Sequence, residues 1–406
     1  MTPGMAPAGE TACGRRSVRH TETAVIYDPG FLHHFGITRV GDVTGLDVIG
    51  MPVWFATRPN SRGLSVAQGK GLTDQQAQLS AIMEAIEGAV AEDTQGHLCD
   101  FCSIDALHRR GVRTIPFEGV SRVRSNSIDF SHERAWVEGY SLRHDHAVLA
   151  PFELVGLDFR ADFPWDRDAF LMSSQGLAAG FDFDRAALHA ILELVENDAC
   201  LLIDALAMQG AATRPIAFAR GQSADLDALI EMLEAVYLDA RFFDLTGANG
   251  IPVVLASIPR ILSTEDGPGS RASAGVACRL NMAEAASSAL QEAIQSRLTD
   301  ISGARDDLSP GRYRADRAAP VRGASSSEKP RPVQATNLLP DNKAGPLWRS
   351  LAEHLFSCGV SDIYLFPLKT GRADVFVVRA LACGMTTANG VESKLNLGAL
   401  NSILGG

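Results

Sequence analysis

The stretch AQLSAIMEAIE, residues 77–87, sets two glutamates, Glu84 and Glu87, at the edge of an apolar helical stripe. Positions three apart lie about 60° apart around an α-helix, so both acids share one face. The pattern returns in AALHAILELVE, residues 186–196, with Glu193 and Glu196. A third copy, SALQEAIQ at 288–295, has Glu292 at the first position and glutamine at the second. The sequence therefore predicts three helices that carry acids at one equivalent place.

A single pair of this kind is usually a solvated helix flank, because glutamate is a good helix former. Three copies at the same edge of the stripe instead favour an arrangement in which the acidic edges of the three helices converge on one region. Like-charged carboxylates about 5 Å apart at an effective dielectric near 20 cost roughly 3 kcal/mol per pair, so such a cluster needs cations. Magnesium accepts a few carboxylates and leaves positions for phosphate and water, whereas the Glu-x-x-His pairs of di-iron bundles do not occur in these helices.

Small residues precede two of the acidic helices. QGKGLTD (68–74) brings Lys70 to the start of the first helix, and GLAAG (176–180) precedes the second. Helix N-termini favour anions, and a lysine can meet a phosphate as a point charge. The Walker motif GxxxxGK[ST] is missing from the sequence. The residues therefore indicate a magnesium–nucleotide site of an unusual, helix-based kind.

Composition and patterning indicate a globular α/β mixture. The chain has 406 residues, 46% of them apolar, and a net charge of −11. Strand-like runs at 51–58, 250–257, 362–368 and 374–381 alternate with helical periods at 73–93, 184–207, 224–238, 283–299 and 345–357. The negative charge disfavours a nucleic-acid partner. Neither a membrane-spanning run nor a secretory signal is recognisable, so we expect a cytoplasmic protein with no membrane partner.

Three segments complete the predicted organisation. Residues 1–20 are predicted to be a disordered tail, and residues 309–332 a mobile loop within a single domain covering 21–406. His97, Cys99 and Cys102 read HxCxxC, which offers three possible zinc ligands without a fourth nearby. We favour an ordinary turn rich in small, half-buried residues over a metal site there.

Several long blocks resemble the YcaO family of ATP-dependent enzymes that activate peptide backbone amides. The resemblance covers roughly residues 36–307 and includes SVAQGKGLT, SAIMEAIE, LHAILELVENDA and ALQEAIQSRLTDISGARDD in the family's order. It implies a YcaO-like fold in which the repeated acidic helices pack on sheets around a Mg–ATP site. The magnesium ligands that it implies are Glu84, Glu87, Glu193, Glu196 and Glu292. The neighbouring nucleotide positions that it implies are Lys70, Ser80, Gln295 and Arg297.

The family's chemistry does not depend on a catalytic side chain in the protein. A Cys, Ser or Thr of the substrate peptide, or external sulfide, adds to a backbone carbonyl, and the resulting oxyanion takes the γ-phosphoryl group of ATP. Loss of phosphate then gives an azoline or, with sulfide, a thioamide. The protein positions the groups and neutralises charge.

The resemblance also bears on partners. No proline follows Pro367, and no room remains beside the matched region for a fused substrate-holding domain. We therefore expect the protein to work with a separate TfuA-like or other substrate-presenting partner, and we favour thioamide formation, with azoline formation as the alternative product. We also expect a homodimer. The family commonly has arginine where Gly88 and Asn197 stand, and asparagine where Phe181 stands. These departures support an alternative, a nucleotide-binding partner subunit without turnover.

Overall fold

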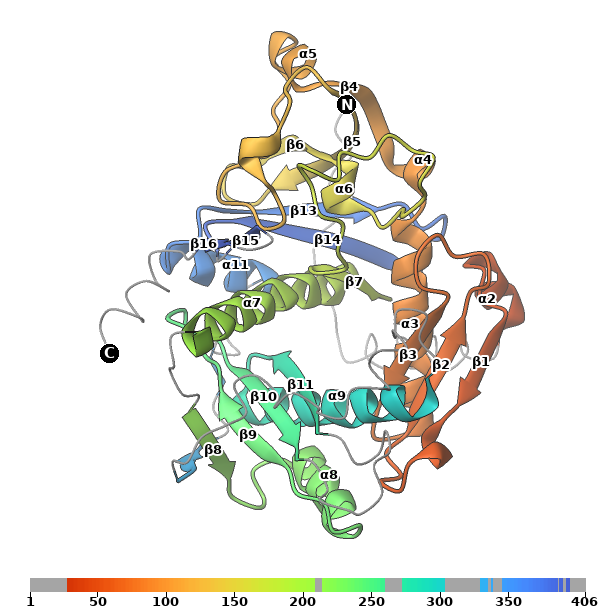
Figure 1. Cartoon of the computed structure of the whole chain (residues 1–406), viewed down its shortest axis with the longest axis vertical. Helices are drawn as coiled ribbons and strands as arrows, with labels where there is room; N and C mark the ends of the chain where they lie inside the picture. Colours follow the sequence, from red (N-terminus) through yellow and green to blue (C-terminus); the bar gives the residue numbers. More distant parts are fainter. Residues whose placement is uncertain are drawn as a thin grey trace.

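The computed structural model describes residues 28–208, 214–259, 272–303, 329–334, 337–338, 345–385, 387–389 and 392–394 (Figure 1). The predicted tail at 1–20 lies outside these residues, as does the predicted loop up to residue 328. Within the described part the chain mixes helices with several sheets, which confirms the predicted α/β class. The end of the predicted loop is ordered, because Arg331 and Pro332 belong to strand β12 (Arg331–Val333), which pairs with β8 (Arg214–Phe218).

Three larger sheets form the framework. The antiparallel sheet nearest the start of the chain has the order β1–β2–β3, with bounds Arg39–Asp42, Val53–Thr57 and Val66–Lys70. A five-stranded sheet has the order β11–β10–β9–β8–β12, and its further strands are β9 (Arg241–Asp244), β10 (Val253–Ile258) and β11 (Ser273–Cys278). A six-stranded sheet has the order β4–β5–β13–β14–β7, with β6 beside β5; the bounds are β4 (Leu98–Ser103), β5 (Glu133–Ser141), β6 (His146–Pro151), β7 (Leu177–Gly180), β13 (Asp362–Leu368) and β14 (Phe376–Cys383). Strands β15 (Thr387–Asn389) and β16 (Glu392–Lys394) form a hairpin.

Each predicted acidic helix follows the terminal strand of one of these sheets. Helix α3 (Asp74–Ala91) follows β3, α7 (Phe183–Met208) follows β7, and α9 (Met282–Ser302) follows β11, and each packs on the strand before it. Figure 1 shows the three helices around the middle of the molecule. The other helical segments of the described part are α2 (Pro29–His34), η1 (Thr44–Leu46), α4 (Thr94–His97), α5 (Ile104–Arg109), η2 (Ser125–Ser127), α6 (Phe152–Val155), α8 (Ala224–Glu234) and α11 (Leu347–Ser357).

Residues within these strand–helix units determine where a helix begins and how closely it packs on its strand. Thr73 caps α3 by accepting a hydrogen bond from the N–H of Gln76, and Asn281 caps α9 in the same way. Glycine lets the helices approach the strands closely. A Cβ on Gly69 would lie 2.0 Å from the backbone nitrogen of Ala81, and one on Gly275 would lie 2.5 Å from the backbone oxygen of Ala289. Backbone therefore packs directly on backbone, which brings helix side chains over the strand edges.

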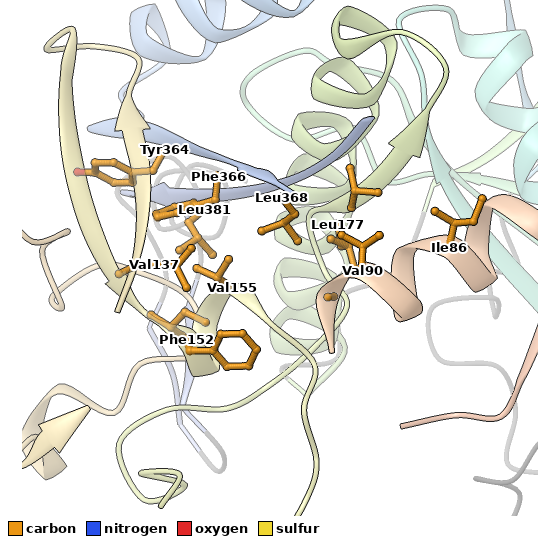
Figure 2. Packing of buried hydrophobic residues seen from close by; sticks show 14 of the residues in the cluster. Ile86, Val90, Val137, Phe152, Val155, Leu177, Tyr364, Phe366, Leu368 and Leu381 are labelled. Atoms are coloured by element: carbon orange, nitrogen blue, oxygen red, sulfur yellow. The ribbon is translucent and has the colours of Figure 1, made fainter. Parts of the chain in front are cut away.

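The apolar stripes are buried as the sequence predicts. Ile86 and Val90 of α3 pack in one cluster with Leu177, Leu368 and Leu381 from the six-stranded sheet (Figure 2). Full burial of such a side chain contributes about 1.5–3 kcal/mol, so the stripe decides which way the helix faces. In the part of the chain that the structure describes, no helix combines the length and the apolar content needed to span a bilayer.

Candidate functional site

Three of the predicted glutamates accept hydrogen bonds from backbone N–H groups in or just before terminal strands. Glu87 on α3 accepts a hydrogen bond of 2.8 Å from the N–H of Ala179 on β7. Glu196 on α7 accepts one of 3.0 Å from the N–H of Cys278 on β11. Glu193 accepts one of 3.0 Å from the N–H of Gly176, just before β7. Glu87 and Glu196 therefore join the acidic face of one strand–helix unit to the edge strand of the next, whereas Glu193 contacts the segment before β7 in its own unit.

The predicted acids contribute to the raised pKa values of their neighbours. Burial, with further contributions from Glu193 and Glu84, raises the pKa of Glu87 well above its ordinary value. Burial and then Glu196 raise the pKa of Glu193 to about 8. Burial and then Glu292 raise the pKa of Glu196 to about 7. These interactions order the carboxylates in a row, which we call the acidic row: Glu84, Glu87, Glu193, Glu196 and Glu292.

Within the described residues, the acidic row is not gathered around a single metal position. Among the residues that the structure describes, no group of three acidic, histidine or cysteine side chains is close enough to hold one metal ion. That these five carboxylates share one region and hold magnesium stays a prediction, and the interactions between neighbours link them pair by pair. Such a row still fits Mg²⁺, because its donors are oxygens, its charges repel, and magnesium commonly takes one or two carboxylates and completes its shell with phosphate oxygens and water.

A lysine pairs with Glu292, the last acid of the acidic row. Lys70 Nζ, at the end of β3, lies 3.1 Å from a carboxylate oxygen of Glu292 on α9. One helical turn beyond Glu292, Gln295 donates a 2.7 Å hydrogen bond to the backbone oxygen of Gln68. Ser80 is half-buried on α3, one turn before Glu84 and on the same face. The structure thus brings Lys70 and Gln295 to the site and leaves Ser80 on the acidic face of its helix.

Arg297 is engaged in a buried ion pair. Its side chain is 5% exposed, and its Nε lies 2.8 Å from a carboxylate oxygen of Asp47, which is 2% exposed. A second nitrogen of the guanidinium lies 3.2 Å from the other oxygen. This bidentate pair fastens the loop after η1 to α9. The role of Arg297 as a nucleotide contact stays a prediction.

Two residues near the acidic row were not identified from the sequence. Arg379 of β14 is fully buried, donates hydrogen bonds to the backbone oxygens of Val155 (2.9 Å) and Gln175 (2.6 Å), and its charge opposes the rise in the pKa of Glu87 and Glu193. A lone arginine within the apolar run DVFVVRAL was its signal in the sequence. The other is His189, which aligns with Ser80 in the repeat and lies one turn before Glu193. Burial and nearby Arg279 lower the pKa of His189 to about 4.

The departures from the family pattern have structural partners. A Cβ on Gly88 would lie 3.0 Å from a guanidinium nitrogen of Arg58, the residue directly after β2. Asn197 accepts a 2.6 Å hydrogen bond from the side-chain amide of Gln175. The ring of Phe181 lies 6.5 Å from that of Phe31. Gly88 and Arg58 also line a cavity of about 620 Å³ that reaches Glu84 and Glu87.

The HxCxxC segment does not form a metal site in the described structure, where no suitable group of ligands is found. Cys99 and Cys102 lie on strand β4, so the predicted turn is wrong. His97 is buried and forms a 2.7 Å hydrogen bond to the backbone oxygen of Val90. Its ring therefore connects the start of β4 to the end of α3.

The family model for YcaO cyclodehydratase, ATP- and Mg²⁺-binding, matches residues 68–386. The chain belongs to the YcaO family. The match confirms the predicted family, and it confirms ATP and Mg²⁺ as the family's ligands. The acidic row and Lys70 lie within the matched residues.

Two relatives match a large share of the chain. A protein in the tfuA 3′ region of Rhizobium leguminosarum bv. trifolii is 34% identical over 409 residues, which are 98% of this chain and 95% of the relative. A protein of Methanothermobacter thermautotrophicus is 28% identical over 306 residues, covering 72% of this chain and 73% of the relative.

Solved structures share the fold. YcaO from Methanopyrus kandleri, bound with AMPPCP and Mg²⁺, has a TM-score of 0.61 and 22% identity and covers 91% of this chain and 90% of its own. A heterocyclase in complex with substrate and cofactor has a TM-score of 0.64 and 17% identity, covering 86% of this chain and 50% of its own, so this chain spans about half of that protein. The Escherichia coli microcin synthetase McbBCD complex gives a TM-score of 0.61 and 14% identity over 86% of this chain and 88% of its own.

Proposed function

We propose that this protein uses ATP and Mg²⁺ to modify a backbone amide of a peptide by phosphorylation of the amide oxygen. The observation that carries the proposal is the acidic row, which ends on Lys70 and is joined by hydrogen bonds to two strand edges. Mg–ATP would supply the phosphoryl group and the neutralising charge. Glu84, Glu87, Glu193, Glu196 and Glu292 would hold the metal ions, and Lys70 would contact a phosphate.

The protein's own backbone and side chains hold the carboxylates of the acidic row in place. The strand-edge hydrogen bonds fix one oxygen of Glu87 and one of Glu196, which leaves the other oxygen of each carboxylate for a cation. Arg379, buried behind Glu87 and Glu193, offsets part of their repulsion. Such preorganised charge costs little reorganisation when the reaction occurs, and this is the main means of catalysis in phosphoryl transfer.

We prefer a catalytic protein to a nucleotide-binding partner subunit without turnover. All five acids and Lys70 are present, and the contacts of Gly88, Asn197 and Phe181 leave the acidic row intact. ATP hydrolysis that depends on a peptide substrate distinguishes the two functions. A chain that binds Mg–AMPPCP tightly but never turns ATP over would support the second.

We further propose a TfuA-like partner, thioamide formation, a homodimer and a cytoplasmic location. Similarity to a protein in a tfuA 3′ region, over nearly the whole of both chains, supports the partner.

Mass spectrometry of the peptide tests this proposal. The peptide is treated with the protein, ATP and Mg²⁺, with and without the partner, and with and without sulfide. We expect little product without the partner, and with it a sulfide-dependent mass gain from exchange of oxygen for sulfur. Loss of one water from the peptide without sulfide would show that the product is an azoline and not a thioamide, and it would leave the proposed use of ATP unchanged. Full activity of the chain alone would contradict the proposed need for a partner.

A further inference from the structure

The three strand–helix units contact one another in a closed cycle. The side chain at the second position of each acidic helix reaches the free edge of the next terminal strand. Glu87 reaches β7, Glu196 reaches β11, and Gln295 of α9 returns to β3. Gln295 thereby joins the third unit to the first.

Only the third contact reverses the direction of the hydrogen bond. Glu87 and Glu196 meet backbone N–H groups, which donate to a carboxylate. Gln295 meets the backbone oxygen of Gln68, which can only accept. A carboxylate at residue 295 would face that oxygen without a proton to share, whereas an amide supplies the donor. The polarity of the strand edge therefore explains why the third copy of the repeat has glutamine.

This contact also sets the place of Lys70. Gln295 and Glu292 lie one turn apart on one face of α9, and Gln68 and Lys70 lie two residues apart on β3, so the two helix–strand contacts run side by side. The side chain of Gln68 is 3% exposed and accepts a hydrogen bond from the hydroxyl of Thr299 on the same helix. Helix α9 thus holds Gln68 by its backbone and by its side chain.

We propose that Gln295 is a positioning residue that fixes β3 against α9 and so places Lys70 beside Glu292, the end of the acidic row. This inference rests on the proposed function for its consequence in nucleotide binding. Its structural content, the register between β3 and α9, holds before any nucleotide binds. The proposal predicts that glutamate at residue 295, which would restore the pattern of the other two helices, weakens the site.

The test uses Gln295→Met and Gln295→Glu in the full chain, with Gln291→Glu as the matched control. Gln291 lies on the same helix, and its amide forms a 3.5 Å hydrogen bond to the hydroxyl of Ser287, one turn earlier. Hydrogen exchange of residues 66–70 is followed by mass spectrometry without nucleotide, and affinity for Mg–AMPPCP is followed by calorimetry. We expect both Gln295 variants to raise the exchange rate roughly tenfold, the factor for one lost hydrogen bond. We also expect Mg–AMPPCP to bind about tenfold more weakly, with Gln295→Glu at least as weak as Gln295→Met, and Gln291→Glu to match the wild type in both measurements.

Two results would overturn the proposal. Tighter Mg–AMPPCP binding by Gln295→Glu would make residue 295 a metal-ligand position. Unchanged exchange without nucleotide, together with weaker binding, would make Gln295 a direct nucleotide contact. If Gln295→Glu does not fold, Gln295→Met, which has nearly the same shape, decides the exchange measurement. Failure of peptide modification in the wild type would remove the proposed function and leave the exchange result standing.

Discussion

Lys70 Nζ lies 3.1 Å from a carboxylate oxygen of Glu292, although 222 residues separate them in the chain. Both side chains are partly exposed, so the pair itself adds at most about 1 kcal/mol to stability. Its importance is its position, because it places a cation at one end of the acidic row. When Mg–nucleotide binds, we expect the metal to take Glu292 and a phosphate to take Lys70.

Removing single charges from the acidic row is expected to abolish turnover. Glu84→Gln, Glu193→Gln and Glu292→Gln each remove one metal-facing charge and almost no volume. We expect peptide-dependent ATP hydrolysis to fall at least about a hundredfold in each, with circular dichroism unchanged. Glu284→Gln, an exposed residue in the first turn of α9, is the control and should match the wild type. Unchanged turnover in all three variants would refute the magnesium assignment.

Stability without metal is expected to fall as the pH rises. The pKa of Glu193 is raised to about 8 and that of Glu196 to about 7, above the ordinary value of 4.5, so the folded protein holds protons that the unfolded chain has released. The free energy of unfolding therefore decreases between about pH 5 and about pH 8, by up to about 1.4 kcal/mol per proton and pH unit. Mg–AMPPCP, which binds the ionised carboxylates, should stabilise most at the upper end.

Thermal unfolding of the wild type and Glu193→Gln across this pH range measures the effect. The glutamine variant lacks the titrating group, so its unfolding temperature should fall less steeply with pH. Identical slopes for the two proteins would show that Glu193 ionises with an ordinary pKa in the folded state.

Arg379→Met is expected to be strongly destabilising. The substitution removes a fully buried cation that donates to the backbone oxygens of Val155 and Gln175 and lies behind two carboxylates. Loss of one partner from a buried charge network costs about 3–5 kcal/mol, measured here by denaturant unfolding. Arg372→Met is the control, because its pair with Asp374 is near the surface and should contribute at most about 1 kcal/mol. Equal effects would mean that Arg379 is not coupled to the acidic row.

Asp47 and Arg297 are expected to act as one unit. Asp47→Asn, Arg297→Met and the double variant form a cycle whose coupling free energy we expect to exceed about 1 kcal/mol in unfolding experiments. The same proteins test the nucleotide role of Arg297. A direct contact would lower Mg–AMPPCP affinity more in Arg297→Met than in Asp47→Asn, whereas a structural role would lower it equally. Additive stabilities would contradict the ion pair.

Local patterns in the sequence determined much of this protein. The three helices with paired acids follow from apolar residues at helical spacing, because burial of that stripe fixes the face on which Glu84, Glu193 and Glu292 lie. Three equivalent acidic positions, oxygen ligands alone and a nearby lysine were sufficient to predict a magnesium–nucleotide site. The α/β class and the family followed from the same blocks.

Only the tertiary structure decided how these pieces meet. The order of the acidic row, the buried charge of Arg379, the pairing of Arg297 with Asp47 and the strand at Cys99 and Cys102 all depend on segments far apart in the chain. Gln295 shows the physical reason. Whether a strand presents an N–H or a C=O at its free edge depends on its register with the neighbouring strand and on which helix packs beside it, and the sequence specifies neither locally.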